Sequence, residues 1–280
     1  MQATLNTYLQ VDRERAKNTF AEYVEQYNAT DEKIKLKIDH TYRVADLCEK
    51  IALSIGLNEN AVNLAWMAGL LHDVGRFEQI RNFGTFSDAD SVDHAKYGAD
   101  ILFCPDSQAC REYSAAFGKN ENGKKIREYM LDDSEDVRLE QAIRCHSAFR
   151  IPQEYDADTR LLSEILRDAD KIDILRVNVD TPMEEIYNVT TEELYQAEVT
   201  DAVMESFFEE HATLRSIKRS PIDHLVGHIS LVYELVFPIS RKLVEEQGYL
   251  DILLGFQSKN PRTREQFAVL NKKMREFLAR

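Results

Sequence analysis

The sequence predicts an all-α protein. Only 10 of its 280 residues are Gly and 6 are Pro, and long stretches are rich in Glu, Leu, Ala, Lys and Arg, which favour helices. Apolar residues recur at spacings of three and four, the period of an amphipathic helix. With 44% hydrophobic residues, the chain is long enough to bury a large core. We find no repeat, low-complexity tract or linker, and we expect residues 1–280 to form a single domain.

In the first part of the chain, the pattern predicts helices joined by short connections. These helices span about 4–28, 32–55, 59–74 and 91–103. Asp31, Asn58 and Ser91 are placed to cap the last three, because their side chains can accept bonds from the first free N–H groups. Gly75 is expected to end the third helix, since glycine adopts the left-handed conformation at little steric cost. Residues 77–93 lack a clean period and are expected to form a long loop beside a functional site.

In the rest of the chain, further helices are predicted around two irregular regions. These helices span about 124–131, 134–146, 158–175, 190–210, 220–247 and 261–280. Residues 104–123 are expected to be irregular, with a solvated turn cluster at 118–123. Pro238 is expected to kink the long helix that contains it.

Charge and cysteine content exclude several classes of protein. The formal net charge of -14 argues against a nucleic-acid polymer or an anionic membrane surface as the main partner. The four cysteines are scattered without a CxxC motif, which favours a reduced, cytoplasmic protein. The first residues lack the basic and apolar regions of a signal peptide, and no apolar run approaches the length of a membrane span.

The segment around His72-Asp73 contains a pair of side chains that could bind a metal ion. An almost unbroken apolar run precedes this pair, so an imidazole and a carboxylate stand at the end of a buried helix. Such a pair is by itself weak evidence, because a capped helix with a hydrogen-bonded histidine gives the same pattern. The aspartates Asp168, Asp170 and Asp173 lie among apolar residues, where unpaired carboxylates are costly unless a cation is near.

Five segments in a fixed order make the pattern specific. They are His40-Thr41-Tyr42-Arg43-Val44-Ala45, Leu70-Leu71-His72-Asp73-Val74-Gly75-Arg76, Asp93-His94-Ala95-Lys96-Tyr97-Gly98-Ala99, Ile143-Arg144-Cys145-His146 and Asp168-Ala169-Asp170-Lys171-Ile172-Asp173. Together they resemble the HD-domain superfamily of metal-dependent phosphohydrolases over about residues 30–178. The resemblance implies an HD-domain helical bundle, with residues 179–280 as additional C-terminal helices that form a cap.

The resemblance also implies a site for one or two divalent metal ions. The first ion would be held by His40, His72, Asp73 and Asp170. The second would be held by His94 and His146, with Asp73 bridging the two ions. Imidazole and carboxylate ligands without thiolate suit Mn, Fe, Co, Ni, Mg or Zn. Some two-metal relatives have paired histidines where this chain has Cys145-His146, and Asp168 or Asp173 are alternatives to Asp170.

The function implied is hydrolysis of a phosphate mono- or diester in a small phosphorylated molecule, with a nucleotide as the leading candidate. The nucleophile would be a metal-bound hydroxide. Asp73, Arg76 and Lys171 are the expected catalytic residues, and Arg76 and Lys171 the expected phosphate-binding cations. Two alternatives remain open: a di-iron oxygenase with the same ligand set, and a small-molecule-binding module without catalysis. His224 and His228, four residues apart on a predicted helix, are interpreted as facing the core or a substrate and not as ligands.

Overall fold

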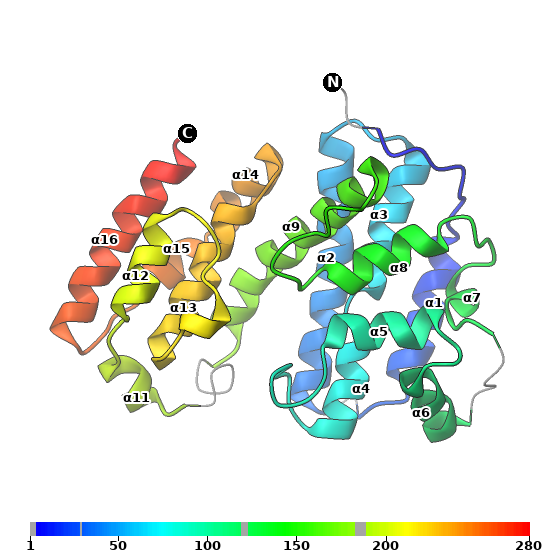
Figure 1. The fold of residues 1–280 in the computed structure, drawn as a ribbon, viewed down its shortest axis with the longest axis horizontal. Helices are drawn as coiled ribbons and strands as arrows, with labels where there is room; N and C mark the ends of the chain where they lie inside the picture. The colour runs from blue at the N-terminus through cyan, green and yellow to red at the C-terminus, as the bar shows by residue number, and fades with distance from the viewer. Residues whose placement is uncertain (1–3, 29, 119–122, 183–188) are drawn as a thin grey trace. The chain divides into compact units, whose positions relative to one another are not determined.

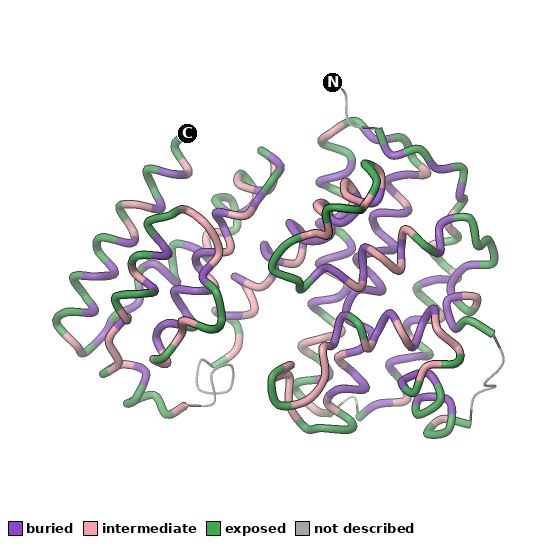
Figure 2. The backbone as a smooth tube through the Cα atoms, in the orientation of Figure 1, coloured by how far each residue is buried: buried purple, intermediate pink, exposed green. Residues whose placement is uncertain are grey.

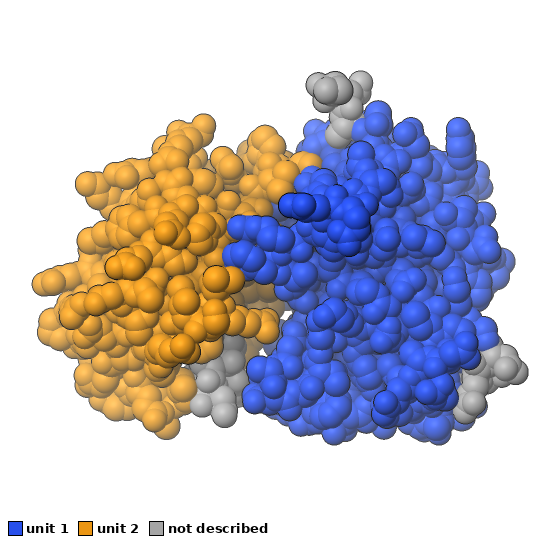
Figure 3. Space-filling model, in the orientation of Figure 1, with its two compact units in different colours: residues 1–169 blue, residues 170–280 orange. Residues whose placement is uncertain are grey.

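The computed structural model describes residues 4–28, 30–118, 123–182 and 189–280 (Figure 1). Every regular element among these residues is a helix and none is a β-strand, so the all-α prediction is confirmed. The chain divides into two compact units, residues 1–169 and residues 170–280 (Figure 3). The single-domain prediction stays a prediction. None of the described helices combines the length and apolar character needed to cross a membrane.

The first unit is built around the pair α2 and α3. Its helices are α1 (Arg13–Val24), α2 (Glu32–Ser54), α3 (Glu59–Leu71), α4 (Val74–Phe83), α5 (His94–Phe103), α6 (Gln108–Phe117), α7 (Ile126–Tyr129), α8 (Asp136–Cys145) and the first half of α9 (Ala157–Asp180). Helix α3 packs along α2, and α5 contacts both α4 and α8. Nearly every residue of α3 is buried, which makes it the centre of the core (Figure 2).

Local sequence signals set the starts of α2 and α3 as predicted. Asp31 accepts a bond from the Lys33 N–H, and Asn58 accepts one from the Ala61 N–H. Within α3, Gly69 lets the two helices approach closely. A Cβ at this position would lie 2.6 Å from the Ala45 Cα of α2. This close contact brings the end of α3 beside the middle of α2.

The N-terminal helix is shorter than predicted, because residues 4–12 are not helical. Asp12 caps α1 by accepting a bond from the Arg15 N–H. In the preceding segment, burial alternates along the chain: Leu5 and Leu9 are each only 2% exposed, whereas Tyr8 is 96% exposed. A period of two is typical of an extended chain lying on a core, and it overrides the weaker helical spacing.

The prediction that Gly75 ends a helix and begins a loop was wrong. Helix α3 ends at Leu71, and α4 begins at Val74, so Gly75 is helical and the connection that follows covers only residues 84–93. The left-handed stop is Gly84, with φ 68°. The cap of the next helix is Asp93, which accepts from the Lys96 N–H, and not Ser91.

Residues 104–123 are also more regular than predicted. Helix α6 occupies Gln108–Phe117, capped by the Ser107 side chain and ended by Gly118 in the left-handed conformation. The buried face of α6 contains only four residues, and one of them is a serine, so the sequence shows no clear apolar period there. Of the predicted turn cluster, residues 119–122 lie outside the described residues.

The second unit contains shorter helices than the sequence indicated. They are the second half of α9, then α11 (Thr191–Gln196), α12 (Asp201–Phe208), the 3-10 turn η1 (Arg215–Ile217), α13 (Pro221–Ile229), the 3-10 turn η2 (Ser230–Glu234), α14 (Pro238–Gln247), α15 (Tyr249–Leu254) and α16 (Pro261–Leu278). The predicted helices 190–210 and 220–247 are therefore each interrupted. Pro238 starts α14 at a position where its missing N–H costs nothing, so the predicted kink was wrong.

Candidate metal centre

Five predicted ligands of the first unit meet in its interior, and all of them except His40 stand at the end of a helix. His40 lies on α2, His72 follows the last residue of α3, and Asp73 immediately precedes α4. His94 is the first residue of α5, and His146 follows α8. All five are at most 5% exposed. The middle of α2 and helix ends far apart in the sequence thus place four imidazoles around one carboxylate.

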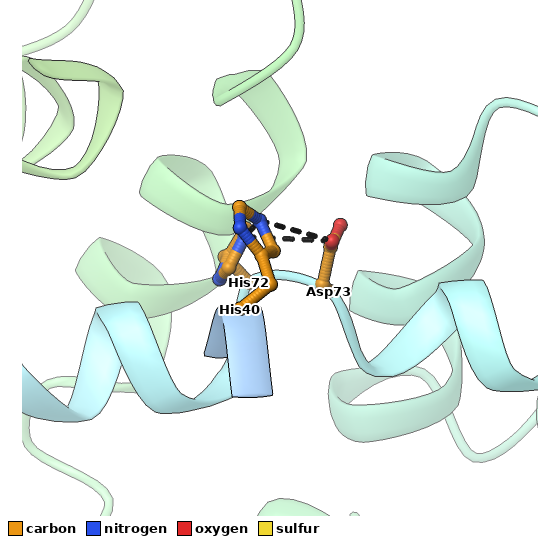
Figure 4. A group of neighbouring side chains, drawn as sticks. All are labelled: His40, His72 and Asp73. Carbon is orange, nitrogen blue, oxygen red and sulfur yellow. Dashed lines mark hydrogen bonds and ion pairs between the residues drawn. The ribbon is translucent and has the colours of Figure 1, made fainter. Parts of the chain in front are cut away.

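One oxygen of the carboxylate faces the first pair of histidines. The Asp73 Oδ2 lies 3.5 Å from the His40 Nε2 and 3.6 Å from the His72 Nε2. The two Nε2 atoms are 3.2 Å apart. Figure 4 shows both rings turned toward the carboxylate. These three side chains form a compact group that could hold a metal ion.

The other oxygen faces the second pair of histidines. The Asp73 Oδ1 lies 3.5 Å from the His94 Nε2 and 3.7 Å from the His146 Nε2. The second pair again forms a group that could hold a metal ion together with Asp73. The carboxylate of Asp73 therefore lies between two similar half-sites and offers one oxygen to each.

Hydrogen bonds fix which ring nitrogen carries the proton. The Nδ1 of His146 lies 2.7 Å from the Ile143 carbonyl oxygen, and the Nδ1 of His94 lies 2.8 Å from the Asp88 carboxylate. Both oxygens can only accept, so each neutral ring donates from Nδ1 and presents a lone pair at Nε2. His72 is oriented in the same way, by the Gly69 carbonyl at 2.7 Å.

The donor set fits divalent metal ions. The Nε2 atoms of His94 and His146 are 3.0 Å apart, and both present lone pairs. Two such nitrogens repel each other unless a cation lies between or beside them. Imidazole nitrogens with carboxylate oxygens, and no thiolate, suit transition-metal ions. The residues present would thus hold one ion in each half-site.

The electrostatics of Asp73 favour its charged form. Burial raises the pKa of this carboxyl group, but the surrounding positive charge outweighs burial and holds the pKa well below its ordinary value. The largest favourable contribution comes from Lys37, whose Nζ lies 2.7 Å from the Asp73 Oδ2. A carboxylate kept ionised inside a core is what a bridging metal ligand requires.

Arg76 holds the loop beside the second half-site. Its Nη1 donates to the Asp88 carboxylate at 2.9 Å, to the Gln79 Oε1 at 2.6 Å and to the Phe86 carbonyl at 2.7 Å. Its Nε points toward the Asp73 Oδ1 at 3.7 Å and has no hydrogen-bond partner. The predicted role of Arg76 in binding phosphate stays a prediction, while its contacts show that it anchors residues 84–93.

Three residues near the centre were missed by sequence reasoning. Lys37 lies one helical turn before His40 on α2, so the i,i+3 spacing from a predicted ligand is the signal that could have found it. Asp88 orients His94, and Gln79 donates to Asp88 at 3.1 Å. Asp88 belongs to the acidic segment expected beside the site, but nothing in the sequence distinguishes it from its acidic neighbours.

The remaining predicted site residues lie on the other unit. Asp170 and Lys171 fall on α9, at the first two positions of the second unit, where Lys171 is 9% exposed. Their assignments as a ligand and as a phosphate-binding cation stay predictions. The neighbouring Asp168 is fully buried in the first unit.

We expect Asp88→Asn to weaken the second half-site selectively. An uncharged amide at position 88 would accept the His94 Nδ1–H more weakly than the carboxylate does. The affinity of the second half-site for its ion should therefore fall about 10–100-fold, while the affinity of the first stays unchanged. Metal titration followed by isothermal calorimetry would measure this. The exposed neighbour Asp90, changed to Asn, is the matched control. Equal weakening of both ions, or of neither, would contradict the assigned role of Asp88.

Stability of the metal-free protein should depend on pH through His94. Burial, assisted by Arg76, lowers the pKa of His94 to about 4 despite the bond to Asp88. The unfolded imidazole titrates near about 6.5, so between these values the unfolded chain binds more protons. The free energy of unfolding should therefore fall as pH drops from about 6.5 to 4, by at most about 1.4 kcal/mol per unit from this group.

Urea denaturation of chelator-treated protein at several pH values would test this dependence. His94→Gln should lose less stability than the wild type over the same interval. Parallel curves for the two proteins would show that His94 is not the group responsible.

Comparison with known protein families finds a match for one part of the chain. Residues 38–104 match the family model of the HD domain, which confirms the resemblance predicted from the sequence. The matched region includes His40, His72, Asp73 and His94, and ends before His146 and Asp170. No curated protein and no solved structure matches the chain.

Proposed function

Because the chain contains an HD domain at residues 38–104, we propose that it is a metal-dependent phosphohydrolase with two divalent ions per chain. The observation that carries this proposal is the position of Asp73. Its two oxygens face two separate histidine pairs, at 3.5 and 3.6 Å on one side and 3.5 and 3.7 Å on the other. A carboxylate shared in this way is suited to bridge two ions.

Two divalent ions held by these residues would polarise a phosphoryl oxygen and lower the pKa of a bound water. The side chains of the protein would orient the metal ligands and supply positive charge. Asp88 and the Ile143 carbonyl hold the Nε2 lone pairs of His94 and His146 toward the centre. The ammonium of Lys37, already beside Asp73, would counter the negative charge that a phosphate ester brings.

In this proposal Asp170 completes the first half-site, and Arg76 and Lys171 bind the phosphoryl group. The substrate is a small phosphorylated molecule, with a nucleotide as the leading candidate. The net charge of -14 supports a small substrate over a nucleic-acid polymer, whose many phosphates would be repelled. The four cysteines, scattered in the sequence without a CxxC motif, support a reducing, cytoplasmic location.

Elemental analysis of protein purified without chelator is the first test. We expect about two divalent ions per chain, together with hydrolysis of at least one compound in a panel of nucleoside mono- and diphosphates and a phosphodiester. Released phosphate reports on the mono- and diphosphates, and the released phosphate monoester reports on the phosphodiester. A protein that binds no Mn, Fe, Co or Ni after reconstitution would overturn the proposal. Iron retention with oxygen uptake and no hydrolysis of any of these substrates would replace it with the oxygenase alternative.

A further inference from the structure

The ammonium of Lys37 neutralises the carboxylate of Asp73 inside the first unit. Its Nζ lies 2.7 Å from the Asp73 Oδ2, and the two side chains are only 15% and 3% exposed. Lys37 lies on α2, one turn before His40, and just outside the part of the chain that matches the HD domain. This lysine is therefore a counter-ion for a carboxylate that is otherwise costly to bury.

The bond from Lys37 uses the same oxygen that faces the first half-site. The Asp73 Oδ2 lies 3.5 Å from the His40 Nε2 and 3.6 Å from the His72 Nε2. A hydrogen bond between an ammonium and a carboxylate is strong, because both partners are charged. An ion held by these three residues would have to share the Oδ2 with Lys37, and two positive charges at short range repel each other. We therefore expect Lys37 and an ion in the first half-site to compete for Asp73.

The oxygen that faces the second half-site is held differently. The Arg76 Nε lies 3.7 Å from the Asp73 Oδ1, which is beyond hydrogen-bonding distance. The Nη1 of Arg76 donates instead to Gln79, to Asp88 and to the Phe86 carbonyl, so this guanidinium is anchored to the loop. The two half-sites thus have similar histidines but differ in the cation that is bonded to their shared carboxylate.

A second contact would keep the ammonium of Lys37 near the centre after it leaves Asp73. The Nζ lies 5.4 Å from the centre of the Phe86 ring, within the range of cation–π attraction. The stem of a lysine is flexible, so the ammonium can move away from one partner and keep another. In that position it would be available to a phosphoryl oxygen of the substrate.

We propose that Lys37 takes the place of a metal ion in the metal-free protein: it neutralises Asp73 until the first half-site is filled, and is then displaced from the Oδ2. Lys37 would thereby keep the metal-free protein folded and lower the affinity of the first half-site, because it stabilises the form without metal. The exchange rests on the proposed function only in that metal must bind, and it is independent of the substrate.

Metal titrations of single half-sites test this competition. His94→Gln leaves the first half-site intact, and His40→Ala leaves the second. In the His94→Gln background, Lys37→Met should tighten Mn²⁺ binding at least about tenfold, because the competitor is removed. In the His40→Ala background, the same change should alter the affinity by less than about threefold. Lys35→Met, an exposed change on the same helix with the same loss of charge, is the control in both backgrounds.

Urea denaturation adds a measurement that distinguishes this exchange from an ion pair that only supports the fold. Lys37→Met should lower the denaturation midpoint of the chelator-treated protein, because Asp73 is then buried without its counter-ion. With saturating Mn²⁺, the midpoint should return to that of the wild type. A purely structural ion pair would stabilise both forms equally, and its removal would not tighten metal binding.

The outcomes for metal binding and for hydrolysis are separable. If Lys37→Met in the His94→Gln background binds Mn²⁺ no more tightly than His94→Gln alone, Lys37 does not compete and the exchange is overturned. If Lys37→Met tightens metal binding but the wild type hydrolyses no phosphorylated substrate, the exchange stands and the proposed hydrolase function falls. A wild-type protein that binds no metal overturns both.

Discussion

Asp73→Asn should abolish metal binding in both half-sites at once. Asp73 belongs to both groups of possible metal ligands, because its two oxygens face the two histidine pairs. An amide of the same shape has one oxygen and no charge, so neither half-site keeps a charged ligand from this residue. We expect elemental analysis to find less than one ion per chain, and phosphate release to fall at least about 10³-fold.

His40→Ala is the informative companion to this variant. It removes a ligand from one half-site only, and should therefore cost one ion and leave the other bound. Asp90→Asn, an exposed change in the nearby loop, should bind metal like the wild type. An Asp73→Asn protein that still holds two ions would show that the carboxylate does not bridge them.

Gly75→Ala should strongly destabilise the first unit, although it adds a single methyl group. A Cβ at this position would overlap the His94 carbonyl oxygen and lie 2.6 Å from the Gly98 N. Both are backbone atoms of α5, so α4 and α5 must separate. We expect the free energy of unfolding to fall by about 3 kcal/mol, and the second half-site to lose affinity because His94 begins α5.

Denaturant unfolding and metal titration would measure these two losses together. Gly84→Asn is the matched control, because asparagine tolerates the left-handed conformation and no atom lies near a Cβ there. It should change neither quantity appreciably. A Gly75→Ala protein with wild-type stability would mean that the two helices are not in contact at this point.

Capping residues and the amphipathic period of the sequence predicted many of the helices of the first unit. The bounds of α2 follow from an aspartate cap and an amphipathic pattern, and the structure agrees within a residue or two. The same signals misplaced the end of α3. Gly75 fits a helix stop in the sequence, but its missing side chain serves a contact with α5, which only the packing reveals.

The sequence by itself determined the helical class of the chain, its HD motif and the residue types that a metal centre needs. Caps, helix propensity and the order of motifs are local, so they can be recognised without a fold. Only the tertiary structure decided that His94 and His146, 52 residues apart, place their Nε2 atoms 3.0 Å from each other. It also decided that Asp88 orients His94 and that Lys37 meets Asp73. These contacts depend on how helix ends converge, and that convergence is set by close packing at Gly69 and Gly75 and not by any local pattern.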